Sequence, residues 1–274
     1  METSAPTGKR LGTLLGRFSV GQYRPTMARK VNEMKSKALV ILSGGQDSTT
    51  CLLWAKELYG EVHAISFDYG QRHIIEIDSA KKVAEIVGVA SHTIVNVQGL
   101  LKSTSPLIDK SAKLEEYVDA DSMERTIGNR VELTFVPLRN LLFAVVAANH
   151  AIALDCYTLV TGVCQMDNAN YPDCTSGFLR RTVDTMREAL GMNRTDYTGP
   201  TLQLLAPLLN YTKSETVRIS LTFPNAVQAL SHSHTCYAGV SPPCGKCHAC
   251  ILRAQGFAEA GFKDPLVERT KQNA

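Results

Sequence analysis

Ser43-Gly44-Gly45-Gln46-Asp47-Ser48 is the stretch that decides the fold of this 274-residue chain. It follows a short apolar run at 38–42, which is typical of a strand buried on both faces of a parallel sheet. A helical pattern follows over 48–58. Two glycines let the backbone approach an anion closely, and the amides at a helix start favour negative charge. The sequence therefore predicts a strand, a phosphate-binding loop and a helix.

The loop differs from two other phosphate-binding patterns. It lacks the Gly-Lys-Ser/Thr ending of a Walker loop and the glycine spacing of a dinucleotide fingerprint. A plain glycine-rich turn is the alternative, but the position after a buried strand favours a phosphate site. Asp47 could help to bind Mg²⁺ or could simply cap the helix.

Apolar runs and helical patterns alternate along the rest of the chain. We expect strands at 62–67, 93–97, 157–161 and 202–205, and helices at 76–87, 140–154, 178–190, 212–219 and 250–260. The helix at 212–219 opens with a capping box, Thr212 with Glu215. Residues 103–132 show little periodicity and are expected to form an irregular insertion. This alternation predicts an α/β fold with a doubly wound parallel sheet of about five strands, with ligands at the carboxyl ends of the strands.

The composition is that of an ordinary globular protein, with 44% hydrophobic and 20% charged residues. No apolar run approaches the roughly 18 residues of a membrane span, and no secretory signal is recognisable. These features argue against a membrane protein and predict a cytoplasmic one. We expect an N-terminal arm at 1–36, an ATP-binding domain at 37–230 and a metal-binding segment at 231–274.

Basic residues gather in the arm. Residues 1–37 carry a net charge of +6, and the remainder carries −3. A basic arm can bind nucleic acid or an anionic surface, whereas the mildly acidic body makes nucleic acid an unlikely partner for the core. A disordered tail, translation starting at Met34 and an organelle transit peptide are alternative interpretations of the arm.

Four of the eight cysteines cluster near the C-terminus, as Cys236, Cys244, Cys247 and Cys250. The C-x7-C-x2-C-x2-C spacing is typical of a tetrahedral Zn²⁺ site, here a zinc knuckle. An iron–sulfur cluster and reactive thiols are the alternatives, and a disulfide framework is not expected. His248 lies inside the cluster, but four cysteines already complete the ligand set.

The phosphate loop resembles that of the PP-loop ATP pyrophosphatases. The resemblance implies that ATP is cleaved to AMP and pyrophosphate, with AMP transferred to a substrate oxygen. It implies catalytic roles for Ser43, Asp47 and Ser48. It also implies ATP binding by Leu42, Ser43, Gly44, Gly45, Gln46, Asp47, Ser48, Thr49, Thr50, Cys51 and Leu52.

Further stretches narrow the resemblance to one family. These are Phe67-Asp68-Tyr69-Gly70-Gln71-Arg72-His73, Phe135-Val136-Pro137-Leu138-Arg139-Asn140, Thr161-Gly162-Val163, Tyr171-Pro172-Asp173-Cys174 and His234-Thr235-Cys236-Tyr237. Together they make residues 38–265 similar to the 7-cyano-7-deazaguanine synthase family. The resemblance implies conversion of 7-carboxy-7-deazaguanine and ammonia to the nitrile, through an adenylated carboxylate and an adenylated amide. It implies ATP, Mg²⁺ and Zn²⁺ as cofactors.

The resemblance also suggests substrate-binding residues. Arg72 and Arg139 could pair with phosphate or with the substrate carboxylate. Asp167 and Asp173 could accept hydrogen bonds from the guanine-like edge, and Tyr171 could stack on the ring. An ordinary ion pair is the alternative for Arg72, and a structural loop role is the alternative for the last three.

The chain departs from the family pattern beside these residues. Leu138, Asn168, Ala169, Asn170 and Thr175 stand where the family has Gly, an aromatic residue, Ser, Gly and Arg. The departures leave room for a ligase that joins the carboxylate to another amine and stops at the amide. A tRNA thiolation enzyme with Cys164 or Cys174 as sulfur carrier, and a non-enzymatic nucleotide- or nucleic-acid-binding module, are further alternatives. The sequence leaves the oligomeric state open, with a homodimer as one possibility.

Overall fold

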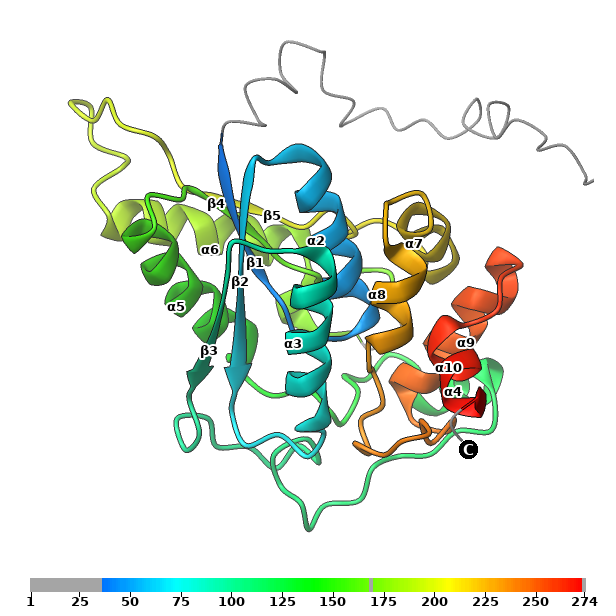
Figure 1. The fold of residues 1–274 in the computed structure, drawn as a ribbon. Helices are drawn as coiled ribbons and strands as arrows, with labels where there is room; N and C mark the ends of the chain where they lie inside the picture. The colour runs from blue at the N-terminus through cyan, green and yellow to red at the C-terminus, as the bar shows by residue number, and fades with distance from the viewer. Residues whose placement is uncertain (1–35, 168–169, 273–274) are drawn as a thin grey trace, which may run out of the picture.

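A five-stranded parallel sheet of order β3-β2-β1-β4-β5 forms the centre of the fold (Figure 1). The computed structural model describes residues 36–167 and 170–272. The strands are β1 Lys37–Ile41, β2 Glu61–Asp68, β3 Ser91–Asn96, β4 Thr158–Val160 and β5 Gln203–Leu205. The predicted α/β class, parallel sheet and strand number are confirmed.

Helices cover both faces of the sheet. On one face, α2 Gln46–Leu58 and α3 Ile75–Val87 share a core with Ala38 and Val40. On the other, α5 Arg139–Ala153 and α6 Ser176–Ala189 share a core with Leu39. Because side chains alternate along a strand, the buried centre of β1, residues 38–40, must be apolar at each position to satisfy both cores.

A group of helices lies beside the sheet on the side of α2 and α3 (Figure 1). It comprises α7 Lys213–Ser220, α8 Ala226–His232, α9 His248–Ala260 and α10 Pro265–Gln272. The predicted capping box is confirmed, since Thr212 accepts from the Glu215 backbone and the Glu215 carboxylate accepts from Thr212. Helices α8 and α10 were not predicted. Val217 and Phe257 share a small core, so the segment after residue 230 packs directly on α7.

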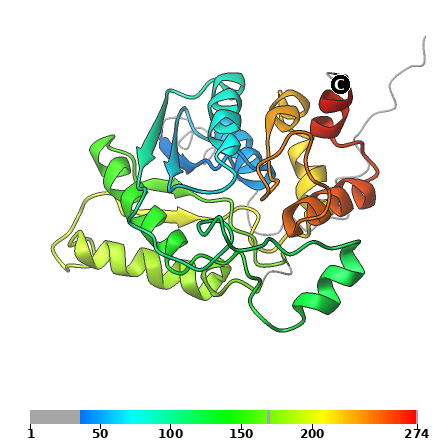
Figure 2. The same cartoon turned by 90° about the horizontal axis from the view of Figure 1, so that it is seen from below.

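The insertion at 103–132 is less irregular than expected. It contains α4 Ala120–Ile127, which begins with a capping box between Asp119 and Ser122. Met123 and Ile127, four residues apart, bury one face of this helix against Ile251 on α9. Figure 2 shows α4 beside the C-terminal helices. Tertiary packing therefore stabilises a helix in which only two residues are buried, too few to form a recognisable apolar pattern in the sequence.

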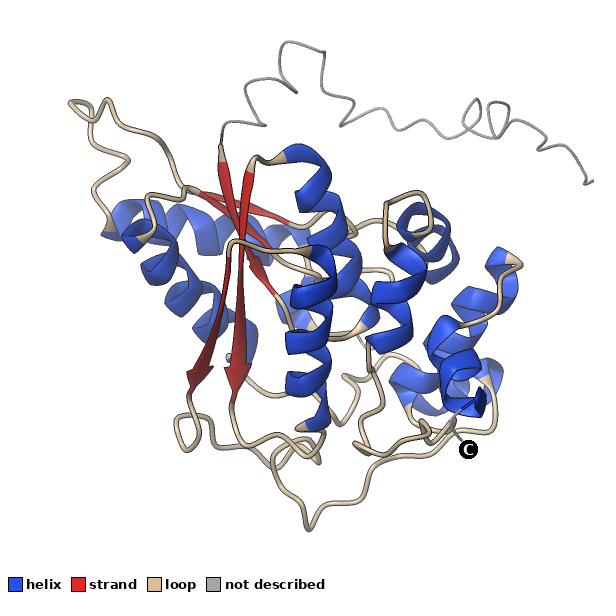
Figure 3. Ribbon diagram, in the orientation of Figure 1, coloured by secondary structure: helices blue, strands red, loops and turns tan. Residues whose placement is uncertain are grey.

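The five parallel strands point their carboxyl ends the same way, and Figure 3 shows the loops below the arrowheads of β2 and β3. None of the helices in the described ranges is long and apolar enough to span a membrane. The predictions for the arm, including Met34, and for Asn168 and Ala169 fall on residues that the structure does not describe.

Candidate functional site

The loop at 43–48 is closed by its two serines. The hydroxyl oxygens of Ser43 and Ser48 lie 3.0 Å apart, and Ser48 Oγ also accepts from the Ser43 amide at 3.2 Å. Gly44 adopts a φ of 88°, and a Cβ there would lie 2.3 Å from the Glu76 carbonyl oxygen. Only glycine fits this position, so the loop can turn tightly against α3.

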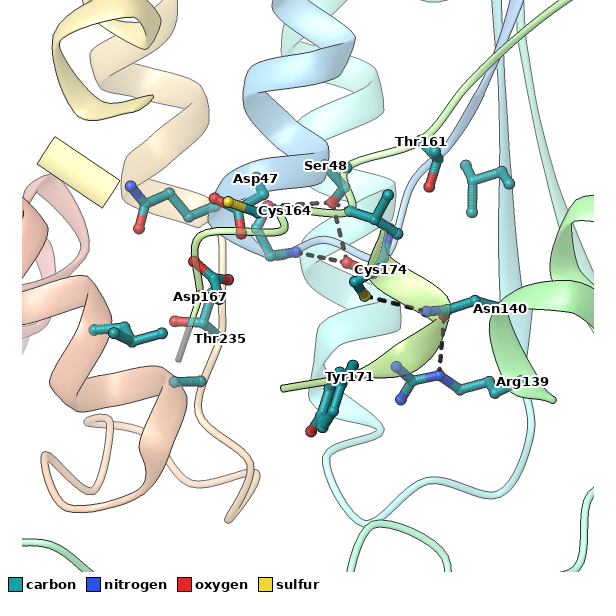
Figure 4. Close-up of a pocket in the computed structure, with 18 of the residues that line it drawn as sticks. Asp47, Ser48, Arg139, Asn140, Thr161, Cys164, Asp167, Tyr171, Cys174 and Thr235 are labelled. Carbon is teal, nitrogen blue, oxygen red and sulfur yellow. Dashed lines mark hydrogen bonds between the residues drawn. The ribbon is translucent and has the colours of Figure 1, made fainter. Parts of the chain in front are cut away.

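A cavity of about 760 Å³ opens beside this loop. Its loop end comprises Ser43, residues 45–48, Asp167 and Lys213. Its arginine end comprises Arg139, Asn140 and Phe143 of α5 together with Tyr69 and Tyr171. Figure 4 shows Asp47 and Ser48 on one side and Arg139 and Asn140 on the other. A volume of this size suits a nucleotide-sized ligand.

Buried polar atoms without a partner gather around the cavity. Among the described residues, six have a buried side-chain nitrogen or oxygen that makes no hydrogen bond, and five of the six line the cavity: Gln46, Asp47, His73, His234 and His248. Leaving such groups unpaired costs free energy. The arrangement is therefore suited to a polar ligand that supplies the missing partners.

A lysine occupies the centre of the loop end. Lys213 Nζ donates to Asp47 Oδ2 at 2.8 Å and to Asp167 Oδ2 at 3.0 Å. Burial alone would lower the pKa of Lys213, but the carboxylates of Asp167 and Asp47 outweigh it and raise that pKa. A Cβ on Gly256 would lie 2.5 Å from Lys213 Cγ, so the glycine lets α9 press on the lysine stem. The lysine is thus a fixed positive charge.

The arginine end holds a cation without a carboxylate partner. Within the described ranges, the Arg139 guanidinium donates to Asn140 Oδ1 at 3.4 Å and to the Tyr69 hydroxyl at 3.5 Å, and it forms no ion pair. It also lies over the Tyr69 ring, 5.9 Å from the centroid. A guanidinium with spare donors beside a cavity is a receptor for an anion such as a carboxylate.

Tyr171 is held in place at the same end. Its hydroxyl hydrogen-bonds to Thr134 Oγ1 and donates to Glu132 Oε2 at 3.2 Å. Burial raises the pKa of the Glu132 carboxyl. The ring of Phe135 packs near the Tyr171 ring, with 5.4 Å between the two centroids. The Tyr171 ring therefore presents a fixed surface to the cavity.

The structure places other predicted site residues elsewhere. Arg72 does not line the cavity; its guanidinium donates to the carbonyl oxygens of Pro106, Asp109, Lys110 and Ala112, at 2.7–3.2 Å. Arg72 thus holds the insertion together rather than facing a ligand. Asp173, in the short 3-10 helix Pro172–Cys174, is buried behind the wall and hydrogen-bonds Asn140. Asp167 lies with Lys213, apart from Arg139 (Figure 4).

The predicted ATP-binding stretch is also divided. Leu42, Ser43, Gly45, Gln46, Asp47 and Ser48 line the cavity. Gly44 turns towards α3, and Thr49, Thr50, Cys51 and Leu52 are buried within α2. Thr50 donates to the Gln46 carbonyl, and Cys51 and Leu52 belong to the core beside β1. These four residues support the loop from behind.

Two positions that depart from the family pattern have left-handed backbone. Leu138 has a φ of 63° and Asn170 a φ of 54°. The side-chain amide of Asn170 donates to the carbonyls of Gly128 and Arg130, each at 2.9 Å, and asparagine tolerates this conformation. Leu138 is 67% exposed and makes no comparable bond. Leucine in this conformation costs about 1–2 kcal/mol.

The four clustered cysteines form a group that could hold a metal ion. Their sulfur atoms all lie within 4.8 Å of one another, and Cys244 Sγ and Cys250 Sγ are 3.9 Å apart. Tetrahedral zinc with bonds of about 2.3 Å requires sulfurs roughly 3.8 Å apart. The amides of Lys246 and Cys247 donate to Cys244 Sγ. The donor set therefore fits zinc.

The cysteine segment touches the phosphate loop directly. The His234 amide donates to the Gly44 carbonyl at 2.8 Å, and a Cβ on Gly45 would lie 3.3 Å from Thr235 Cγ2. The Lys246 carbonyl accepts from the Tyr117 amide of the insertion at 2.8 Å. The metal-binding segment thus holds the loop and the insertion in register.

Comparison with known proteins identifies the family. A family model described as "Queuosine biosynthesis protein QueC" matches residues 37–261. The 7-cyano-7-deazaguanine synthase of Gloeobacter violaceus is 45% identical over 86% of this chain and 97% of its own length. That of Laribacter hongkongensis is 44% identical over 85% and 94%. The chain belongs to the QueC family.

One solved structure illustrates a more distant similarity. A 4-thiouridine synthetase in complex with RNA and ATP aligns with a TM-score of 0.39 and 17% identity, over 86% of this chain and 53% of that one.

Sequence reasoning missed Lys213 in this QueC-family chain. One signal was available, because a lysine in the first turn of a helix opposes the helix dipole and so has another task. The cysteine spacing makes His248 unnecessary as a metal ligand and indicates no other role for it. Glu132 lies at the end of the insertion, where no motif marks it. Their positions depend on contacts between distant elements, which spacing does not reveal.

Proposed function

We propose that the chain is a 7-cyano-7-deazaguanine synthase, an ATP-dependent ligase. It converts 7-carboxy-7-deazaguanine and ammonia to 7-cyano-7-deazaguanine and releases AMP and pyrophosphate. Family membership supports this proposal, and so does one observation from the structure. A single cavity joins a phosphate loop backed by Lys213 to Arg139, a cation free to bind a carboxylate.

The loop end would bind the triphosphate. The backbone of residues 43–48 and the Ser43 and Ser48 hydroxyls offer donors to phosphate oxygens, and the start of α2 adds a favourable dipole. Lys213 would neutralise charge that develops on departing pyrophosphate. Asp47 Oδ1 has no partner, so Asp47 and Asp167 would hold Mg²⁺, which screens phosphate charge when bound.

The arginine end would bind the deazaguanine acid. Arg139 pairs with its carboxylate and turns one oxygen towards the α-phosphate, and Tyr171 packs against the flat ring. Asp173 acts through Asn140, which it orients. We assign Arg72 no contact with the substrate, since its donors are occupied by the insertion.

The reaction needs two rounds of adenylation. In the first, a carboxylate oxygen attacks the α-phosphorus, and pyrophosphate leaves. Ammonia adds to the acyl carbon, loses a proton and displaces AMP, which gives the amide. In the second, the amide oxygen attacks the α-phosphorus of another ATP, pyrophosphate leaves, and the nitrogen loses one proton. Loss of AMP and of the remaining N–H proton then leaves the nitrile. The residues contribute by orientation and charge, and no protein nucleophile is required.

Zinc is the metal that we propose for the four cysteines. Its role is structural, because four thiolates leave no open position for a substrate. It would fix the segment that contacts Gly44 and Gly45.

The test is incubation with ATP, Mg²⁺, ammonium and 7-carboxy-7-deazaguanine, with products followed by mass spectrometry. We expect the nitrile together with two AMP and two pyrophosphate per turnover. ADP and phosphate as the only nucleotide products would contradict the proposal. Omission of ammonium is the matched control.

An amide-forming ligase is the second candidate, favoured by Leu138 and Asn170 at two positions where the family has glycine. The same incubation decides between them, because this ligase would stop at an amide. A thiolation enzyme receives no such support: burial raises the pKa of the Cys164 and Cys174 thiols to about 12 each. We expect Cys174→Ser to retain the synthase activity within about twofold. A tenfold loss would revive the sulfur-carrier hypothesis.

A further inference from the structure

His248 is a buried imidazole with two unpartnered nitrogens. It is 3% exposed and lines the cavity, and neither Nδ1 nor Nε2 makes a hydrogen bond. The other two histidines of the cavity each use one nitrogen. His73 Nε2 lies 3.2 Å from a Glu76 carboxylate oxygen, and His234 Nε2 donates to the Val240 carbonyl at 3.0 Å. His248 therefore has the largest unmet need for polar partners.

The position of His248 relates it to the loop end. It is the first residue of α9, whose next residue, Ala249, also lines the cavity. Helix α9 packs on α7, and Gly256 of α9 lies against the aliphatic part of the Lys213 side chain at the start of α7. Asp167 and Lys213 line the same cavity as the His248 ring. The ring thus faces the same cavity as the charges at the phosphate loop.

His248 is not needed as a metal ligand. The four sulfurs of Cys236, Cys244, Cys247 and Cys250 already form a closed group. Because His248 directly follows Cys247, the four-cysteine group nevertheless fixes the position of its backbone. Four thiolates complete a tetrahedral site, so the imidazole remains available to a ligand in the cavity.

We propose that His248 contacts the nucleotide, with one ring nitrogen donating a hydrogen bond to a phosphate oxygen of its pyrophosphate portion. The inference rests on the proposed function, since it takes ATP as the ligand of residues 43–48. A phosphate oxygen only accepts, and an imidazole offers one donor. The second nitrogen accepts from water that accompanies the ligand. The cysteine segment thereby supplies a binding group as well as a scaffold.

The test measures binding of pyrophosphate in the presence of Mg²⁺ by calorimetry. His248→Phe keeps the ring shape without polar atoms, and we expect it to weaken binding about 10- to 100-fold, because hydrogen bonds to charged groups are strong. His248→Asn and His248→Gln place an amide nitrogen near Nδ1 and near Nε2, respectively. We expect one of them to recover most of the affinity, which identifies the nitrogen used.

Zinc content and a matched histidine serve as controls. His232→Phe changes a histidine at the end of α8, outside the cavity, and should bind pyrophosphate like the unmodified chain. Each His248 variant should retain one zinc. Equal loss in all three variants together with loss of zinc would mean a structural role and would overturn the inference.

Two further results would overturn it. One is pyrophosphate binding by His248→Phe within about twofold of the unmodified chain, and the other is no binding by the unmodified chain. If His248→Phe raised only the KM for the deazaguanine acid, His248 would contact that substrate and not the nucleotide, which would also overturn the inference. Failure to make the nitrile, with binding that still depends on His248, would sink the proposed function and leave this inference standing.

Discussion

At its loop end the cavity is lined mainly by one short loop, Ser43 with residues 45–48, whereas its arginine end is assembled from α5, the turn after β2 and the segment around Tyr171. The loop end works through backbone amides and a helix start, which depend on glycines and local geometry. The arginine end depends on side chains that tertiary contacts bring together. We therefore expect departures from a family pattern to be tolerated more readily at the arginine end.

The two ends also differ in charge. At the loop end, Lys213 is paired with two carboxylates. At the arginine end, Arg139 has no such partner in the described ranges. The cation at the loop end already has carboxylate partners, whereas the cation at the arginine end is available to an anion. Mutations at the two ends should therefore affect different substrates, which can be tested in order of expected effect.

The largest effect is expected from removing the support of the loop end. Cys247→Ser breaks the metal site, and structural zinc contributes on the order of 10 kcal/mol to folding. We expect insoluble or metal-poor protein, measured by elemental analysis and thermal unfolding. Cys156→Ser is the control, because Cys156 is buried in the sheet core outside the cluster. Soluble, active Cys247→Ser protein without zinc would show that the loop needs no such support.

Loss of the central cation should follow. We expect Lys213→Met to lower kcat/KM for ATP about 10²- to 10³-fold, as removal of one preorganised charge does. Steady-state kinetics should show little change in the KM for the deazaguanine acid. Lys56→Met, at an exposed lysine of α2, is the control. An effect confined to the acid would mean that the two ends have been assigned the wrong way round.

Two arginines provide the opposite test. Arg139→Leu should raise the KM for the acid about 10- to 150-fold, the cost of a hydrogen bond to a charged group. Its affinity for ATP should change little. Arg72→Leu is the matched variant, and we expect it to lower thermal stability by loosening the insertion, with a smaller effect on that KM. Equal KM effects in both variants would argue that Arg72 also reaches the substrate.

The smallest effect concerns the strained leucine. Leu138→Gly should stabilise the protein by about 0.5–1 kcal/mol, since glycine adopts a positive φ freely but costs more entropy. Urea unfolding would measure this. Leu133→Gly, also at an exposed leucine but without positive φ, should be neutral or destabilising. If Leu138→Gly is the less stable of the two, the left-handed backbone is held by contacts that the leucine supplies.

The sequence by itself determined the parts that depend on local rules. The parallel sheet follows from apolar strands alternating with helices, the loop from two glycines before a helix, and the metal group from cysteine spacing. The capping box at Thr212 was visible for the same reason, because each of these signals lies within a few residues.

Only the tertiary structure decided which side chains meet. Lys213 is 166 residues from Asp47, yet their side chains hydrogen-bond. Arg72 stands beside a recognisable stretch, yet its donors bind carbonyls of the insertion. His248 follows a cysteine by one position, yet its ring lines the cavity. Spacing along the chain fixes the neighbours of a residue within an element, whereas packing between elements decides what its side chain reaches.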